Sequence, residues 1–157
     1  MPLEATKRFL TVFVLGAIVM FLVSLLHPDL ILHNNMPTGG DMGAHVWGPA
    51  FLRDHLLPNF RLTGWSMDWY AGFPMYQFYM VVPAIFIVIL NVVIPYGIAF
   101  KLVVISGVLT LPFCAWGLGR LARLAFPIPE LFAVAATIFL LDESFTIYGG
   151  NIASTLA

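Results

Sequence analysis

The chain has 157 residues, of which 61% are hydrophobic and 10% are charged, and its formal net charge is -1. Because a soluble domain carries about 25% charged residues, this composition and a mean hydropathy of +0.94 predict an integral membrane protein. No Lys/Arg cluster is present to neutralise a run of phosphates, which argues against nucleic-acid binding. The single Cys114 excludes an internal disulfide and any cysteine-based zinc or redox motif.

The first predicted element is a membrane span over residues 9–26. These 18 residues carry no charge, and at about 1.5 Å per residue they cover most of a hydrocarbon core of about 30 Å. Lys7 and Arg8 precede the span and place the N-terminus in the cytoplasm by the positive-inside rule. A signal peptide is the alternative, but the long apolar core and the lack of a small-x-small cleavage site before "HPDLIL" favour a retained span.

A long extracytoplasmic loop, residues 27–97, follows and carries an unusual share of charge for so apolar a chain. A helix is predicted from Asp41 through "MGAHVWGPAFLRDHLL", with a bend or restart at Pro49. Asp41 and His45 are four residues apart and share one face of this helix. Asp41 is either a simple N-cap or part of a site, and the spacing alone leaves both interpretations open.

Aromatic residues also gather in this loop: Trp47, Trp65, Trp69, Tyr70, Tyr76 and Tyr79. Tryptophan and tyrosine are enriched at membrane interfaces, where they anchor a segment at the level of the lipid headgroups. Aromatic faces also stack on sugar rings. The spacing of these residues does not distinguish the two uses.

The next two apolar stretches, residues 76–94 and 98–119, determine the topology. If both cross the membrane, Arg120 and Arg123 lie outside, against the positive-inside rule. If residues 76–94 form a re-entrant or interfacial segment, residues 98–119 become the second span and both arginines are cytoplasmic. Pro83 and Asn91 fit such a broken segment, although an ordinary span that disobeys the rule remains the alternative.

A third span is predicted over residues 128–148, opened by Pro129. Asp142 and Glu143 then emerge on the same outer side as Asp41. Ionisable residues at membrane depth are costly and usually face a cavity or a partner. We therefore expect an all-α polytopic helix bundle whose long first outer loop carries juxtamembrane helices. Because three or four spans account for the chain, we also expect it to be the N-terminal part of a larger protein.

The chemistry that suits such a loop is group transfer at the membrane surface. A carboxylate such as Asp41 can act as a general base toward an acceptor hydroxyl, and a phosphate leaving group requires cations or a metal. Arg53, Arg61 and Lys101 are the available cations, although Lys101 can equally be a snorkelling interface lysine. The sequence contains no P-loop, no G-x-S-x-G and no G-x-G-x-x-G motif.

The segments "TGGDMGAHVW", "FLRDHLLPNFRLTGWSMDWYAGFPMYQFY", "PYGIAFKLV" and "YGGNIASTLA" carry a family resemblance. With one span followed by a large outer loop, the chain resembles the GT-C superfamily of polyprenyl-phosphate-sugar-dependent membrane glycosyltransferases. More narrowly, it is similar to a group of large multispanning actinobacterial proteins placed near that superfamily. The similarity covers most of the chain after the first span.

The resemblance implies that Asp41 is the catalytic base or a ligand of a divalent cation, Mg or Mn, with His45 in support. It implies a phosphate-binding role for Lys101, and we add Arg53, Asp142 and Glu143 as further substrate-binding candidates. The expected function is transfer of a sugar from a polyprenyl-phosphate donor to a cell-envelope acceptor at the inner (plasma) membrane. The alternative is a non-catalytic membrane component: part of a transporter, a lipid-binding scaffold or an assembly partner.

Overall fold

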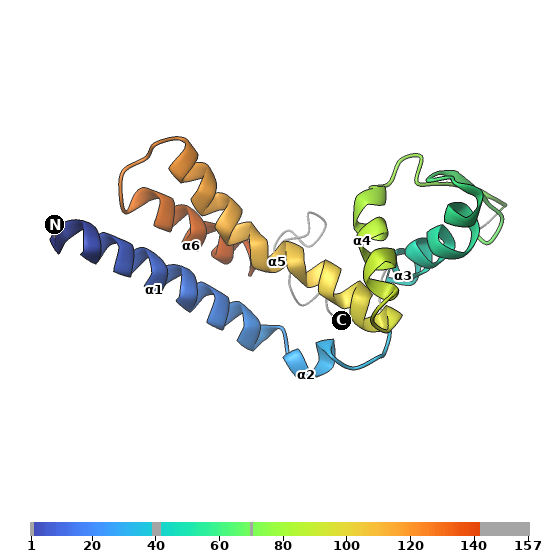
Figure 1. The fold of residues 1–157 in the computed structure, drawn as a ribbon, viewed down its shortest axis with the longest axis horizontal. Coiled ribbons are helices and arrows are strands. Elements are labelled where there is room, and N and C mark those ends of the chain that lie inside the picture. Colours follow the sequence, from blue (N-terminus) through green and yellow to red (C-terminus); the bar gives the residue numbers. More distant parts are fainter. Residues whose placement is uncertain (1, 39–41, 70, 142–157) are drawn as a thin grey trace. The chain divides into compact units, whose positions relative to one another are not determined.

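The computed structural model describes residues 2–38, 42–69 and 71–141. The chain forms two compact units, one made of Met1–Leu30 with Ile105–Ala157 and the other of Ile31–Val104 (Figure 1). We call the first the helical unit and the second the loop unit. Helix α5, Tyr96–Leu121, contributes its first turns to the loop unit and the rest to the helical unit.

The helical unit contains α1 (Pro2–Leu25), the C-terminal part of α5, and α6 (Ile128–Leu140). Helices α5 and α6 approach closely at Gly119, where a Cβ atom would lie 2.9 Å from the Cα of Pro129. This contact requires a residue without a side chain. From the sequence alone, Gly117 and Gly119 both suggest room for a lipid tail, but the space at Gly119 is taken by α6. A Cβ atom added to Gly117 would meet none of the described residues within 4 Å.

Two helices in the described part of the chain are long and apolar enough to cross a membrane. Leu3–Leu25 has 23 residues and a mean hydropathy of 2.3, and Tyr96–Leu121 has 26 residues and a mean hydropathy of 2.1. Only 11% and 28% of their apolar windows are buried, whereas the core helix of a soluble protein is mostly buried. Phe9 and Val12 are 67% and 71% exposed. An apolar surface of this kind is typical of proteins that contact lipid or another protein.

Helices α4 (Val81–Asn91) and α6 are shorter. They have 11 and 13 residues, which correspond to about 16 and 20 Å and fall short of a hydrocarbon core of about 30 Å. The expectation that residues 76–94 form a re-entrant or interfacial segment remains a prediction, with α4 as its helical part. The expected extension of the third span to residue 148 lies outside the described residues.

The loop unit starts after the single turn of α2 (Pro28–Ile31). Helix α3, Met42–Phe51, continues into a π-helical turn at Leu52–Leu56 and a 3₁₀ turn at Leu57–Asn59. Pro49 lies inside α3, so the carbonyl of His45 receives no backbone donor four residues on. A helix is present where it was predicted, but it runs through Pro49 without restarting there. The wider turn at Leu52–Leu56 was not predicted.

A short β-hairpin follows the 3₁₀ turn in the loop unit. Strand β1, Gly64–Ser66, pairs antiparallel with β2, Phe73–Met75, with Trp65 opposite Pro74. An all-α fold was expected, so the hairpin is a correction to that expectation. Strands of three residues show too little alternation of apolar and polar residues to be recognised in a sequence.

The core of the loop unit is aromatic and aliphatic. One cluster joins α3 and the π turn to β2 and α4; its buried members are Phe51, Leu52, Leu56, Met75, Tyr76 and Ala84. A second joins α4 to the start of α5 through Ile87, Ala99 and Phe100. Because the unit buries its own apolar residues, it can hold polar side chains at fixed positions.

Candidate functional site

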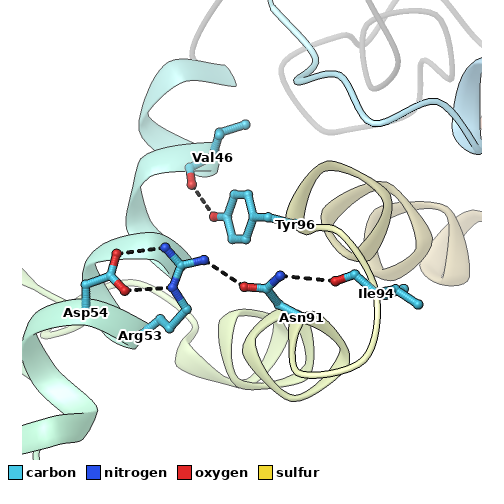
Figure 2. Close-up of polar contacts among 6 residues, drawn as sticks. All are labelled: Val46, Arg53, Asp54, Asn91, Ile94 and Tyr96. Carbon is cyan, nitrogen blue, oxygen red and sulfur yellow. Dashed lines mark hydrogen bonds and ion pairs between the residues drawn. The ribbon is translucent and has the colours of Figure 1, made fainter.

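The π-helical turn carries Arg53, a predicted substrate-binding residue, at the centre of a hydrogen-bond network (Figure 2). The Nε and Nη2 atoms of Arg53 donate to the two carboxylate oxygens of Asp54 at 2.7 and 2.8 Å. Its Nη1 atom donates to Oδ1 of Asn91, on α4, at 2.7 Å. The guanidinium group also lies 5.3 Å from the centre of the Tyr96 ring. Arg53 therefore joins three helical segments of the loop unit.

The electrostatics of this pair follow from the two hydrogen bonds. The pKa of Asp54 is lowered, mainly by its hydrogen bond with Arg53, and the pKa of Arg53 is raised by the same bond. The side chains are 38% and 50% exposed, so solvent screens much of the attraction. Both groups stay charged at neutral pH, and the network presents one positive and one negative charge at the surface of the unit.

The network continues through the ends of α4 and α5. Nδ2 of Asn91 donates to the carbonyl of Ile94 at 3.1 Å, and the hydroxyl of Tyr96 donates to the carbonyl of Val46 in α3. These contacts hold the turn between α4 and α5 against α3, as Figure 2 shows. The position of Arg53 is consequently determined by several elements that are distant in sequence.

Lys101, the second predicted phosphate-binding cation, is buried at 8% exposure. Its Nζ atom donates to the carbonyl of His33 at 2.5 Å and to Oδ1 of Asn35 at 2.7 Å. Close by, a Cβ atom on Gly97 would lie 2.5 Å from the carbonyl oxygen of Asn35. Lys101 thus ties the segment after α2 to α5. A snorkelling lysine would extend its ammonium group to the membrane interface, and a phosphate-binding lysine would direct it to the ligand, whereas here it bonds to protein oxygens. Phosphate binding by Lys101 remains a prediction.

The other predicted site residues are placed as follows. His45 is exposed on α3, with its ring edge-on to Tyr79 at 6.4 Å between centroids. Asp41, Asp142 and Glu143 lie outside the described residues. Within residues 2–38, 42–69 and 71–141, no three His, Cys, Asp or Glu side chains come together to hold a metal ion. The predicted metal role of Asp41 falls outside that range and remains a prediction.

A buried carboxylate in the helical unit was not anticipated. Glu130, at the start of α6, is 6% exposed; its Oε1 accepts hydrogen bonds from Thr11 of α1 at 2.7 Å and from Trp116 of α5 at 3.3 Å. Its Oε2 has no hydrogen-bond partner among the described residues. The signal in the sequence is a lone acidic residue in an apolar stretch, a pattern that marks candidate functional residues in membranes. Its partners, far away in the sequence, could not be foreseen.

Comparisons of the chain with protein-family models, with curated proteins and with solved structures found no match.

Proposed function

We propose that this chain is part of a GT-C-like membrane glycosyltransferase. It would move a sugar from a polyprenyl-phosphate donor to a cell-envelope acceptor on the outer face of the inner membrane. The observation that supports the proposal is the loop unit. It is a folded unit with its own core and ordered charged groups, and it follows a helix long and apolar enough to cross a membrane.

In this proposal the chain is a polytopic helix bundle with a cytoplasmic N-terminus. Asp41 accepts the proton of an acceptor hydroxyl as its oxygen forms the new bond to the anomeric carbon, or it holds a divalent cation, Mg or Mn. The bond between that carbon and the donor phosphate oxygen breaks, and polyprenyl phosphate leaves with the electron pair. His45 supports Asp41, Lys101 and Arg53 are assigned to the phosphate, and Asp142 and Glu143 are assigned to other parts of the substrate.

The decisive experiment is the Asp41→Asn substitution in the full-length protein. Membranes would be given polyprenyl-phosphate-linked mannose, glucose or arabinose, and radiolabel in the envelope fraction would be measured. Loss of a general base costs about 10²–10⁴-fold in rate, so transfer should fall at least a hundredfold. The matched control is Asp29→Asn, which removes an exposed carboxylate from α2. Absence of transfer by the wild type, or equal transfer by the two variants, would refute the enzyme proposal.

A non-catalytic membrane component is the second candidate, and one observation favours it. Arg53 and Lys101, both assigned to substrate phosphate, donate hydrogen bonds to protein oxygens. Such contacts are what a cation with a purely architectural role would make. Under this alternative, Arg53→Gln and Lys101→Met would lower the stability of the protein, and no sugar transfer would be detected in the wild type.

A further inference from the structure

A groove of about 460 Å³ lies in the loop unit, on the side of the hairpin and the helical turns that precede it. Its polar lining consists of His55, Asn59, Arg61, Ser66 and Asp68, and Trp65 contributes an indole ring. The volume falls within the range of about 300–1,000 Å³ that small-molecule sites occupy. None of these residues belongs to the site proposed above, so the groove calls for a separate explanation.

Trp65 is the large aromatic side chain of the groove, and its position is set by the backbone. The indole is 63% exposed but lies directly over Gly72, where a Cβ atom would be 2.3 Å from Nε1 of Trp65. Gly72 has a φ of +123°, a conformation that favours glycine. The indole is therefore an exposed aromatic surface that packs on the backbone of residue 72, and this contact depends on the absence of a side chain there.

The polar groups around the indole are also held in place. Ser66, 1% exposed, accepts a hydrogen bond from the backbone N–H of Asp68 and donates one to Oδ2 of Asp68, both at 3.2 Å. Nδ2 of Asn59 donates to the carbonyl of His55 at 2.9 Å. A carboxylate has about four acceptor positions, so Asp68 keeps most of its capacity for a ligand.

The lining selects one ligand chemistry. The positive charge of Arg61 is balanced by the negative charge of Asp68, so the groove does not favour a phosphate. Its five polar side chains make it unsuitable for a lipid tail. A flat aromatic face surrounded by donors and acceptors suits a sugar ring, because each hydroxyl group both donates and accepts.

We propose that this groove binds a sugar ring of the glycan acceptor, with the ring stacked on Trp65 and its hydroxyl groups bonded to Asp68, Arg61 and Asn59. The acceptor role rests on the proposed function. Carbohydrate binding itself requires neither Asp41 nor a donor lipid, and it is measured without catalysis.

The test is calorimetric titration of the full-length protein in lipid nanodiscs with three probes: methyl α-mannopyranoside, methyl α-glucopyranoside and methyl α-arabinofuranoside. At least one probe should bind saturably to the wild type. Loss of an aromatic stacking surface should weaken that binding about tenfold in Trp65→Ala, whereas Trp65→Phe should retain most of it. Gly72→Ala should weaken binding as well, because its Cβ displaces the indole. The matched control is Phe78→Ala, which removes an aromatic ring that is 84% exposed and does not line the groove.

Two results would overturn the proposal: no saturable binding of any probe, or equal binding by wild type and Trp65→Ala. The chain has four tryptophans, so brominated lipids are tested on wild type and Trp65→Phe. Quenching of tryptophan fluorescence that is present in the wild type and lost in Trp65→Phe would also overturn the proposal, because the indole of Trp65 would then lie in the membrane. Asp41→Asn separates the two proposals. Sugar transfer that depends on Asp41, without probe binding, refutes only the groove, and probe binding without any transfer refutes only the enzyme.

Discussion

The two units bury polar groups in opposite ways. In the helical unit, the carboxylate of Glu130 on α6 accepts hydrogen bonds from Thr11 of α1 and Trp116 of α5. In the loop unit, the long cationic side chains of Lys101 and Arg53 instead donate hydrogen bonds to oxygens of other segments. The difference follows from the elements available. Long helices satisfy their own backbone, whereas a loop with short elements leaves carbonyl groups that need donors.

The units also differ in what brings their backbones together. In the helical unit, α5 and α6 meet at Gly119 without a side chain between them. In the loop unit, aromatic and aliphatic side chains fill the space between α3, β2 and α4, and a close backbone approach occurs at Gly97, where a Cβ atom would lie 2.5 Å from the carbonyl oxygen of Asn35. Substitutions should therefore act on the helical unit mainly through added volume, and on the loop unit through lost hydrogen bonds and, at Gly97, through added volume.

The largest effect is expected for Gly119→Ala. Its Cβ would meet the Cα and side chain of Pro129 at 2.9 and 3.2 Å, so the backbone of α5 or α6 must move, at a cost of about 3 kcal/mol. Gly117→Ala is the matched control, because a Cβ atom on residue 117 would meet none of the described residues within 4 Å. Thermal unfolding in detergent micelles measures both. If the two variants have the same unfolding temperature, the inferred close packing of α5 and α6 at Gly119 is wrong.

Lys101→Met should have the next largest effect. Methionine fills a similar volume but removes the two hydrogen bonds that the buried ammonium group donates to His33 and Asn35, and the loss of hydrogen bonds from a charged group costs about 2 kcal/mol. Lys7→Met is the control, since Lys7 pairs with Glu4 at 2.8 Å on an exposed surface, where a salt bridge contributes at most about 1 kcal/mol. Hydrogen exchange should increase at residues 33–35 in Lys101→Met alone. Unchanged exchange there would contradict the anchoring role of Lys101.

Thr11→Val tests the buried carboxylate of the helical unit. Valine keeps the shape of threonine but removes the donor to Oε1 of Glu130, with an expected loss of about 1 kcal/mol. Thr110→Val is the control, because Thr110 is exposed and donates to carbonyls of its own helix, those of Ser106 and Gly107. Unfolding of the two variants in micelles should differ by several degrees. Equal stability would mean that Glu130 does not link α1 to α6.

The sequence predicted features that depend on composition and local spacing. Two long apolar helices appear where apolar stretches were recognised, and a helix with an internal Pro49 lies where the pattern placed it. The hairpin was missed because its strands have three residues each. The contacts of Arg53 with Asn91 and of Lys101 with His33 were missed because the partners lie 38 and 68 positions away, and no local pattern records such contacts.

The smallest effect is expected for the exposed pair of Arg53 and Asp54. The pKa of Asp54 is lowered in the folded chain, so the pair stabilises the protein above the unfolded pKa of about 4. That contribution is lost as the pH falls through the folded pKa. With both side chains more than a third exposed, the effect should stay below about 0.5 kcal/mol. Unfolding midpoints of wild type and Asp54→Asn, measured from pH 7 to pH 2, should differ slightly at neutral pH and converge in acid. If Asp54→Asn were instead the more stable protein at neutral pH, the carboxylate would destabilise the loop unit, and the stabilising role of the pair would be wrong.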